Sequence, residues 1–419
     1  MELFPLFSAV LVLAAVFAWV NYRYLKLPTT IGVMVMALGA STVVVLLRAV
    51  GVVPAEPIAD FLGQLEFGSA VLDVWLAFLL FAGALHVDFG RLLGSAKVIG
   101  ILATLGVVFT MLMVGALIHL VAGFCGVELS FIEAAVFGAL IAPTDPIAVL
   151  GILRTAGAPK DLEIKITGES LFNDGVGVVL FTVVLAVAGA GGIHAPHGAL
   201  EISKFFAWEV FGALGLGLLC GYLTYLLMRV VEDAHLEVLL TFALACGLFS
   251  LCGALHTSGP LAVVAAGLFI GNSGRALAMG EEVRRRVDEF WELVDEILNV
   301  LLFVLIGLEV LVLDLSGPAI ALGFLAIPLV LASRFVGTKL LLSMLGRSLN
   351  LPAYTTTIMT WGGLRGAISV ALALSIPTSF AARDVILTST YIVVAFSILG
   401  QGLTIGPLIR RLQAQSSEG

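Results

Sequence analysis

The chain has 419 residues, of which 60% are hydrophobic and 12% are charged, and its formal net charge is −8. Its mean hydropathy is +1.13. Soluble domains carry about 25% charged residues, so this composition excludes an ordinary soluble domain and predicts a membrane protein. Lysines and arginines are few, so nothing predicts binding to nucleic acid.

A helix needs about 20 apolar residues to cross a bilayer. Thirteen stretches approach or exceed this length, which predicts an all-α membrane protein with 13 transmembrane helices that forms one unit over residues 1–419. We interpret the first stretch as a retained span, because it lacks the basic start and the clear cleavage site of a signal peptide. The predicted spans are 3–20, 28–48, 67–87, 97–121, 131–153, 166–190, 205–230, 235–255, 259–273, 291–313, 317–346, 354–375 and 383–409.

The basic residues of the connecting loops predict the orientation. If the N-terminus lies outside, fifteen lysines and arginines fall in inside loops and three in outside loops. This is the asymmetry that the positive-inside rule describes. We therefore expect a multi-pass protein of the cell membrane, with its N-terminus outside and its C-terminus in the cytoplasm. The link at residues 274–290 is expected to be a solvated amphipathic segment.

Two of the spans are interrupted. The fifth contains Pro143 and Pro146 on either side of Asp145, and a proline inside a helix removes a backbone hydrogen bond and clashes with the preceding turn. The twelfth contains a glycine-rich stretch at residues 360–366. The two spans would cross the membrane in opposite directions, which is typical of an inverted-repeat transporter with its site at the midplane.

The sixth span supplies polar side chains beside this interruption. Ser170 and Asp174 are four residues apart and lie on one face of a helix. Together with Asp145 and the freed carbonyl of Thr144 they offer hard oxygen ligands, which suit a small hard cation and not a soft metal. Charged groups at this depth cost roughly 2.5–3.5 kcal/mol each, so their presence indicates a function.

The arginine of the twelfth span, Arg365, needs a partner, because an unpaired guanidinium in the membrane is costly. We expect Glu169, which forms an adjacent stripe with Asn173 on the sixth span, to pair with it. A compatible alternative is that Arg365 faces the partial charges of the broken helix ends. Arg334 in the eleventh span is expected to pair with a carboxylate or to snorkel, in a structural role.

Four segments carry a family resemblance. They are Gly168–Gly175 (GESLFNDG), Ala142–Pro146 (APTDP), Gly362–Gly366 (GGLRG) and Phe303–Glu309 (FVLIGLE). At these residues the chain resembles the first monovalent cation–proton antiporter family, the NhaP-type sodium/proton antiporters, and the likeness runs over essentially the whole chain. It implies the NhaA/NhaP-like antiporter fold, with inverted repeats and two discontinuous crossing helices.

The resemblance also implies an organisation into two parts and a homodimer. A core part, approximately residues 67–190 and 317–411, would move against a dimerisation part, approximately residues 1–48 and 205–313. The expected partners are therefore a second copy of the chain, membrane lipid, and the transported cation and proton. No cofactor is expected.

Roles for single residues follow from the resemblance as well. Asp174 would be the main carrier of ion and proton, and Asp145, Ser170 and Thr144 would complete the Na+ site. Asn173 stands where electrogenic relatives have a second aspartate, which implies electroneutral one-for-one exchange.

The resemblance further implies that Glu169 and Arg365 form a supporting ion pair. One departure is Ala82, which replaces a glutamate that is frequent in the third span of relatives. A ligand present in some relatives is therefore missing, and the ion selectivity can differ.

These observations predict a secondary transporter that exchanges Na+ or Li+ for H+, contributes to pH regulation and is not an enzyme. Burial disfavours the charged form of a carboxyl group, so Asp174 could hold either a proton or a cation. A K+/H+ antiporter of the same fold is an alternative. An intramembrane aspartyl protease would also use two aspartates, but Asp174 precedes its glycines instead of following them. An ion channel would need a selectivity loop, and none is visible.

Overall fold

The computed structural model describes residues 3–50, 69–145, 153, 157–190, 199–231, 233–275, 278–311, 313, 316–345, 352 and 354–417. Within these residues every regular element is a helix, which confirms the predicted all-α class. The α-helices are α1 (Leu3–Val20), α2 (Thr29–Ala49), α4 (Ser69–Leu85), α5 (Phe89–Gly94), α6 (Ala96–Ile101), α7 (Val107–Ala122), α8 (Phe131–Ile141), α10 (Lys160–Leu185), α11 (Ala199–Ala207), α12 (Ala213–Met228), α13 (Ala234–Leu255), α14 (Gly259–Phe269), α16 (Glu281–Glu309), α17 (Gly317–Met344), α18 (Thr355–Trp361), α19 (Ala367–Leu374), α20 (Arg383–Phe396) and α21 (Gly402–Ser417).

Short π-helical segments extend or join several of these helices, so that the continuous helical rods are longer than the α-helices alone. The segments are Asn21–Leu25, Leu102–Gly106, Ala186–Ala190, Trp208–Gly212, Ile270–Gly274 and Ser397–Gln401. A 3₁₀ turn, Gly123–Cys125, follows α7.

The helices correspond to the predicted spans. Among the described residues, eight rods are long and apolar enough to cross a membrane, and three shorter apolar helices lie in the third, fifth and ninth predicted spans. The amphipathic α16 and the interrupted pair α18 and α19 occupy the tenth and twelfth. Each predicted span therefore has a helical counterpart, while the number of crossings stays a prediction.

The segment before the tenth predicted span is not a separate link. Of the expected link at 274–290, residues 281–290 are the first third of α16, which begins at Glu281, ten residues earlier than the predicted span. Arg285 pairs with Glu289 at 3.7 Å and Arg286 pairs with Glu282 at 3.8 Å, both one turn apart. Pairs at this spacing stabilise an exposed helix, so the charged stretch continues the apolar one.

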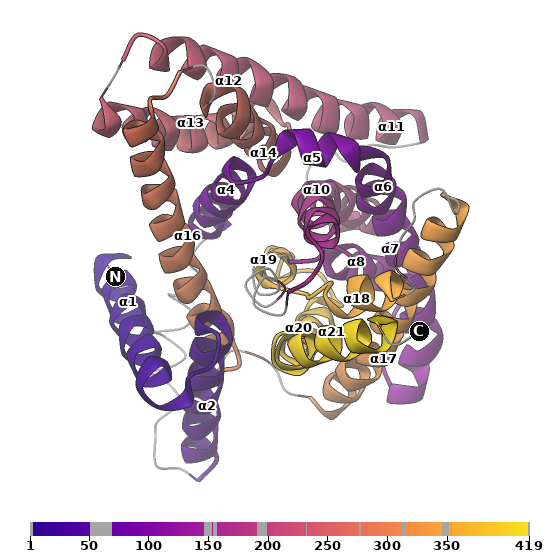
Figure 1. Ribbon diagram of the computed structural model, residues 1–419. Helices are drawn as coiled ribbons and strands as arrows, with labels where there is room; N and C mark the ends of the chain where they lie inside the picture. Colours follow the sequence, from indigo (N-terminus) through magenta and orange to yellow (C-terminus); the bar gives the residue numbers. More distant parts are fainter. Residues whose placement is uncertain are drawn as a thin grey trace.

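The helices pack into two groups. Helices α1, α2, α4, α12, α13, α14 and α16 pack mainly on one another and are called the α16 group here. Helices α6, α7, α8, α10 and α17–α21 form the α10 group. Figure 1 shows α1, α2 and α16 at one side, α12–α14 at the top, and the α10 group at the other side, with α4 and α19 between them.

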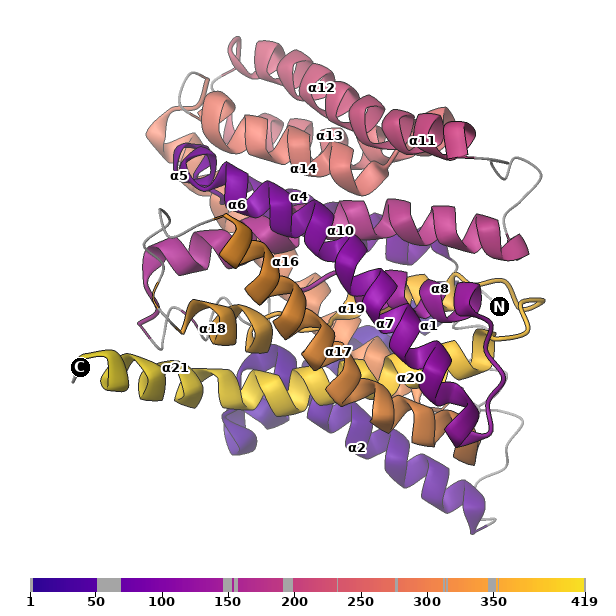
Figure 2. The ribbon, with the colours of Figure 1, turned by 90° about the vertical axis from the view of Figure 1, so that its right-hand side faces the viewer.

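The long helices run broadly side by side across the molecule, as Figure 2 shows. The first and last described residues lie towards opposite ends of this arrangement (Figure 2). Contacts between the two groups run mainly from α10 to α14 and from α19 to α4 and α16. The boundary between the groups therefore passes through the centre of the molecule.

Both predicted interruptions are present. Helix α8 ends at Ile141, and non-helical residues follow it up to Asp145. Helix α18 ends at Trp361 and α19 begins at Ala367. An isolated antiparallel bridge joins Asp145 to Leu364, so the two interrupted segments cross each other at the centre of the α10 group. Pro146 lies outside the described residues.

Candidate functional site

The interruption of α8 begins with Pro143. Its ring prevents the helix from continuing, and Gly177 of α10 lies directly beside it, where an added Cβ atom would overlap the ring. The two N–H groups that the break leaves free are both bonded. Thr144 N–H donates to Asn173 Oδ1 at 3.2 Å, and Asp145 N–H donates to the Leu364 carbonyl at 2.8 Å. Irregular backbone at membrane depth requires such partners.

Arg365 bonds the carbonyl groups at the end of α8. Its Nη1 atom donates to the carbonyl of Ala142 at 2.6 Å and to the carbonyl of Pro143 at 2.7 Å, and the side chain is 2% exposed. The C-terminal end of a helix carries a partial negative charge that favours a cation. The alternative proposed for Arg365, contact with a broken helix end, is therefore confirmed.

Glu169 pairs with a different arginine from the one predicted. Its Oε1 atom lies 2.5 Å from Nη1 of Arg334 on α17, and both side chains are at most 5% exposed. Arg365 is within electrostatic range of this pair but makes no ion pair with Glu169. The expected Glu169–Arg365 ion pair is therefore corrected to Glu169–Arg334, since Arg365 directs its Nη1 atom to the carbonyl groups at the end of α8.

Three polar side chains predicted for the site form one hydrogen-bonded cluster. Asn173 Nδ2 donates to Thr144 Oγ1 at 2.8 Å, and Thr144 Oγ1 lies 2.9 Å from Ser170 Oγ. All three residues are buried. The cluster ties α10 to the interrupted segment, so the neutral amide of Asn173 holds this backbone in place.

The second interruption is held in the same way by the π-helical segment Ser397–Gln401, which joins α20 to α21. Gln401 Nε2 donates to the carbonyl of Trp361, the last residue of α18, at 3.0 Å. Arg365 N–H donates to Ser397 Oγ at 2.8 Å, and Ser397 Oγ in turn donates to Gln401 Oε1 at 2.7 Å. Both broken ends are thus bonded by side chains of neighbouring elements.

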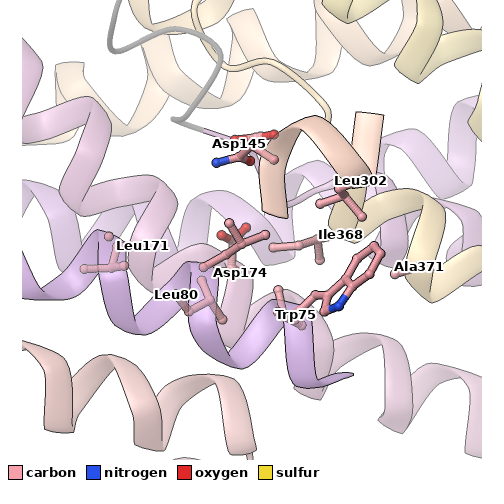
Figure 3. A pocket seen from close by; sticks show the side chains of 13 residues that line it. Trp75, Leu80, Asp145, Leu171, Asp174, Leu302, Ile368 and Ala371 are labelled. Atoms are coloured by element: carbon pink, nitrogen blue, oxygen red, sulfur yellow. The ribbon is translucent and has the colours of Figure 1, made fainter. Parts of the chain in front are cut away.

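A cavity of about 60 Å³ lies where the α10 group meets the α16 group, and it has room for a few water molecules. Figure 3 shows Asp145 and Asp174 at this cavity, among apolar side chains such as Leu80, Leu302 and Ile368. Four helices and the crossing segment line the cavity. The lining residues are Trp75, Leu76, Leu79, Leu80 and Gly83 of α4, Leu171 and Asp174 of α10, Asn299 and Leu302 of α16, Ala367, Ile368 and Ala371 of α19, and Asp145 of the crossing segment.

The two carboxyl groups of the cavity differ in their surroundings. Asp174 is 3% exposed, and among the described residues nothing forms a hydrogen bond with its Oδ1 atom. Asp145 is half-buried and packs against Gly366, where a Cβ atom would overlap its carboxylate. The groups are close enough to interact electrostatically. A buried carboxylate without partners is costly unless it is protonated or binds a cation.

The structure thus brings Asp174 and Asp145 together at the cavity and places Thr144, Ser170 and Asn173 in the adjoining cluster. The roles of these residues in ion binding stay predictions. Sequence reasoning missed Asn299, which is 2% exposed and comes from the other helix group. A signal was present, since Asn299 is four residues after Asp295, on the same helical face, and directly before the apolar stretch 300–308.

The fold and the site can now be compared with known proteins. The profile of the family described as sodium/hydrogen exchanger, transmembrane, matches residues 11–411. The chain belongs to the sodium/hydrogen exchanger family. This membership confirms the resemblance found in the motifs, places the chain among integral multi-pass membrane transporters, and gives no support to an intramembrane protease.

Two relatives and one solved structure illustrate the likeness. The Na(+)/H(+) antiporter NhaP of Pseudomonas aeruginosa is 46% identical over 99% of this chain and 99% of its own length. The Na(+)/H(+) antiporter NhaH of Halobacillus dabanensis is 36% identical over 83% of this chain and 84% of its own length. The sodium proton antiporter MjNhaP1 of Methanocaldococcus jannaschii is similar in fold, with a TM-score of 0.75 over 98% of each chain at 20% identity.

A double-mutant cycle tests the observed ion pair. Arg334→Met should lower the melting temperature of the purified protein sharply, because removing one partner of a buried pair costs about 3–5 kcal/mol. Adding Glu169→Gln should recover part of this loss, since no buried carboxylate then stays unpaired. The cycle that combines Glu169→Gln with Arg365→Met should show a smaller coupling. A larger coupling to Arg365 would restore the original expectation.

Proposed function

We propose that this protein exchanges Na+ for H+ across the cell membrane and that Asp174 and Asp145 form the shared binding site. The observation that carries the proposal is Asp174, a buried carboxyl group with an unbonded oxygen in a cavity between two helix groups. Carboxylate oxygens are hard ligands and suit Na+ or Li+. The relatives named above as Na(+)/H(+) antiporters favour sodium over the K+/H+ alternative.

Exchange follows from competition at one carboxyl group. Binding of a metal ion requires the ligand to be deprotonated, so that cation and proton exclude each other. The same group, loaded first with one and then with the other, couples the two fluxes without a cofactor. Thr144 precedes Asp145 in the chain, and its hydroxyl group lies 2.9 Å from that of Ser170. We expect oxygen atoms of Thr144 and Ser170 to complete the site.

Alternating access requires the site to face each side in turn. The cavity is bounded by α10 and α19 on one side and by α4 and α16 on the other. A relative movement of the two helix groups would change which side of the membrane reaches Asp174. We expect the α10 group to carry the ion. The boundary between the helix groups differs from the predicted division at α4, which lies within the predicted core at 67–190 but packs mainly on α13, α14 and α16.

The surrounding charges favour one-for-one exchange. Glu169 is neutralised by Arg334, and Arg365 is bonded to backbone carbonyls. Asn173 is neutral and committed to Thr144. Asp174 with a bound proton and Asp174 with a bound Na+ have the same net charge. The site would therefore carry the same charge across the membrane in both directions of the cycle, and no net charge would be moved.

The setting in the membrane is part of the proposal. Leu11, Val12 and Val16 of α1 and Leu219 and Leu223 of α12 are exposed apolar side chains. We expect lipid and a second copy of the chain to cover these faces, giving a homodimer in the cell membrane. The opposite positions of the two chain ends fit an outside N-terminus and a cytoplasmic C-terminus (Figure 2).

Removing the charge of Asp174 should abolish exchange. In sealed vesicles, Asp174→Asn should reduce sodium-driven proton flux to the level of vesicles without the protein, because an amide cannot carry a proton in exchange for a cation. The matched control is Asp161→Asn, an exposed aspartate in the first turn of the same helix, which should keep wild-type flux. Wild-type flux in Asp174→Asn would exclude this site.

Competition predicts a defined pH dependence. Where Asp174 is mostly protonated, each unit of decrease in pH should raise the apparent KM for Na+ about tenfold. The maximal rate at saturating Na+ should change far less. Initial rates of proton flux measured over a grid of pH and Na+ concentrations give both quantities. An apparent KM that stays constant across pH would contradict a shared site.

Electroneutral exchange should be insensitive to membrane potential. In vesicles clamped with potassium and valinomycin, the initial rate of Na+/H+ exchange should be the same at zero and at strongly negative potential. A rate that follows the potential would mean that charge crosses with each cycle, and that more than one proton moves per Na+.

A further inference from the structure

The cavity holds side-chain oxygens from three residues only, among those that line it. They are Asp145, Asp174 and Asn299. Trp75 has a ring N–H, which donates and cannot bind a cation, and the other lining side chains are apolar or absent. A hard cation at the two carboxylates therefore has one neutral side-chain oxygen within the same cavity.

Asn299 is held so that its oxygen is available. It is 2% exposed, and its Nδ2 atom donates to the backbone carbonyl of Asp295 at 2.8 Å, one turn earlier in α16. With its nitrogen bonded to the backbone, the amide has its oxygen to offer to the cavity that Asn299 lines. An amide oxygen is a hard ligand that suits a small hard cation.

Asp295 holds the amide of Asn299 in place. Its backbone carbonyl accepts from Asn299 Nδ2, and its side chain also interacts with Asn299. These contacts fix the amide nitrogen, so that the oxygen is the group left to face the ion. Asp295 is thus a positioning residue for Asn299.

We propose that Asn299 is a Na+ ligand contributed by the α16 group to the site on the α10 group. The proposal rests on the function proposed above. Asp145 and Asp174 stand on segments of the α10 group, whereas α16 packs mainly on α1, α2, α4 and α13. The amide therefore reaches the ion across the boundary between the groups and binds it in the arrangement seen here. A neutral ligand strengthens binding without adding charge, so the stoichiometry is unaffected.

Two substitutions distinguish the contribution of the Asn299 amide oxygen to Na+ binding from that of the amide nitrogen. Asn299→Leu removes both and should raise the KM for Na+ about tenfold, the effect of one lost polar contact, with the maximal rate largely kept. Asn299→Asp keeps an oxygen and loses the N–H donor, and at alkaline pH it should have a KM at or below that of the wild type. Sodium-driven proton flux in vesicles measures both.

The control is Asn272→Leu in the π-helical segment after α14. Asn272 also donates to backbone carbonyls, those of Val87 and Leu268, but does not line the cavity. Its loss should lower yield or maximal rate without changing the KM. A wild-type KM in Asn299→Leu, or an equal rise in Asn299→Asp, would overturn the proposal. Absence of exchange in the wild type would instead overturn the proposed function.

Discussion

The site depends on how the protein satisfies backbone groups that two broken helices expose at the centre of a membrane fold. No water-rich solvent is available there, and each unbonded group costs several kcal/mol. The crossing meets this demand with a bridge between Asp145 and Leu364 and with side chains from α10 and from the π-helical segment Ser397–Gln401. These bonds limit how far the crossing can rearrange. They also fix the backbone position of Asp145.

The same demand decides where the charges go. Arg365 directs its Nη1 atom to two carbonyl groups at the end of α8, and Glu169 pairs with Arg334 from α17. These contacts hold the buried charges around the crossing in place. Asp174 lies at the cavity, and its Oδ1 atom has no hydrogen-bond partner among the described residues. Because the neighbouring charges are held in structural contacts, Asp174 is the group proposed to alternate between a proton and a metal ion.

The sequence was sufficient to predict the class of fold, both interruptions and the two aspartates, because prolines, glycines and isolated carboxylates are rare in apolar spans and have strong local effects. It was not sufficient to pair the arginines. Arg334 and Arg365 lie on consecutive spans, and both can reach the sixth span in a compact bundle. Which of the two arginines pairs with Glu169 depends on whether carbonyl groups at the end of α8 accept hydrogen bonds from it. That competition depends on how the two interrupted segments cross, and the local sequence pattern does not reveal it. The start of α16 was placed too late for a similar reason, since a charged stretch at a membrane surface can be a loop or a continued helix.

Asn299 shows what a reading limited to the motifs omits. The three motifs that hold the predicted site residues lie on segments of the α10 group, whereas a site that must open to either side needs contacts that form in one arrangement and break in the other. An amide on α16 meets this requirement, because it belongs to the group across the boundary and carries no charge. If a third carboxylate stood there instead, the ion would be held more tightly in one state and the charge per cycle would change. A neutral oxygen at the boundary can help to bind the ion in one arrangement and still release it in the other.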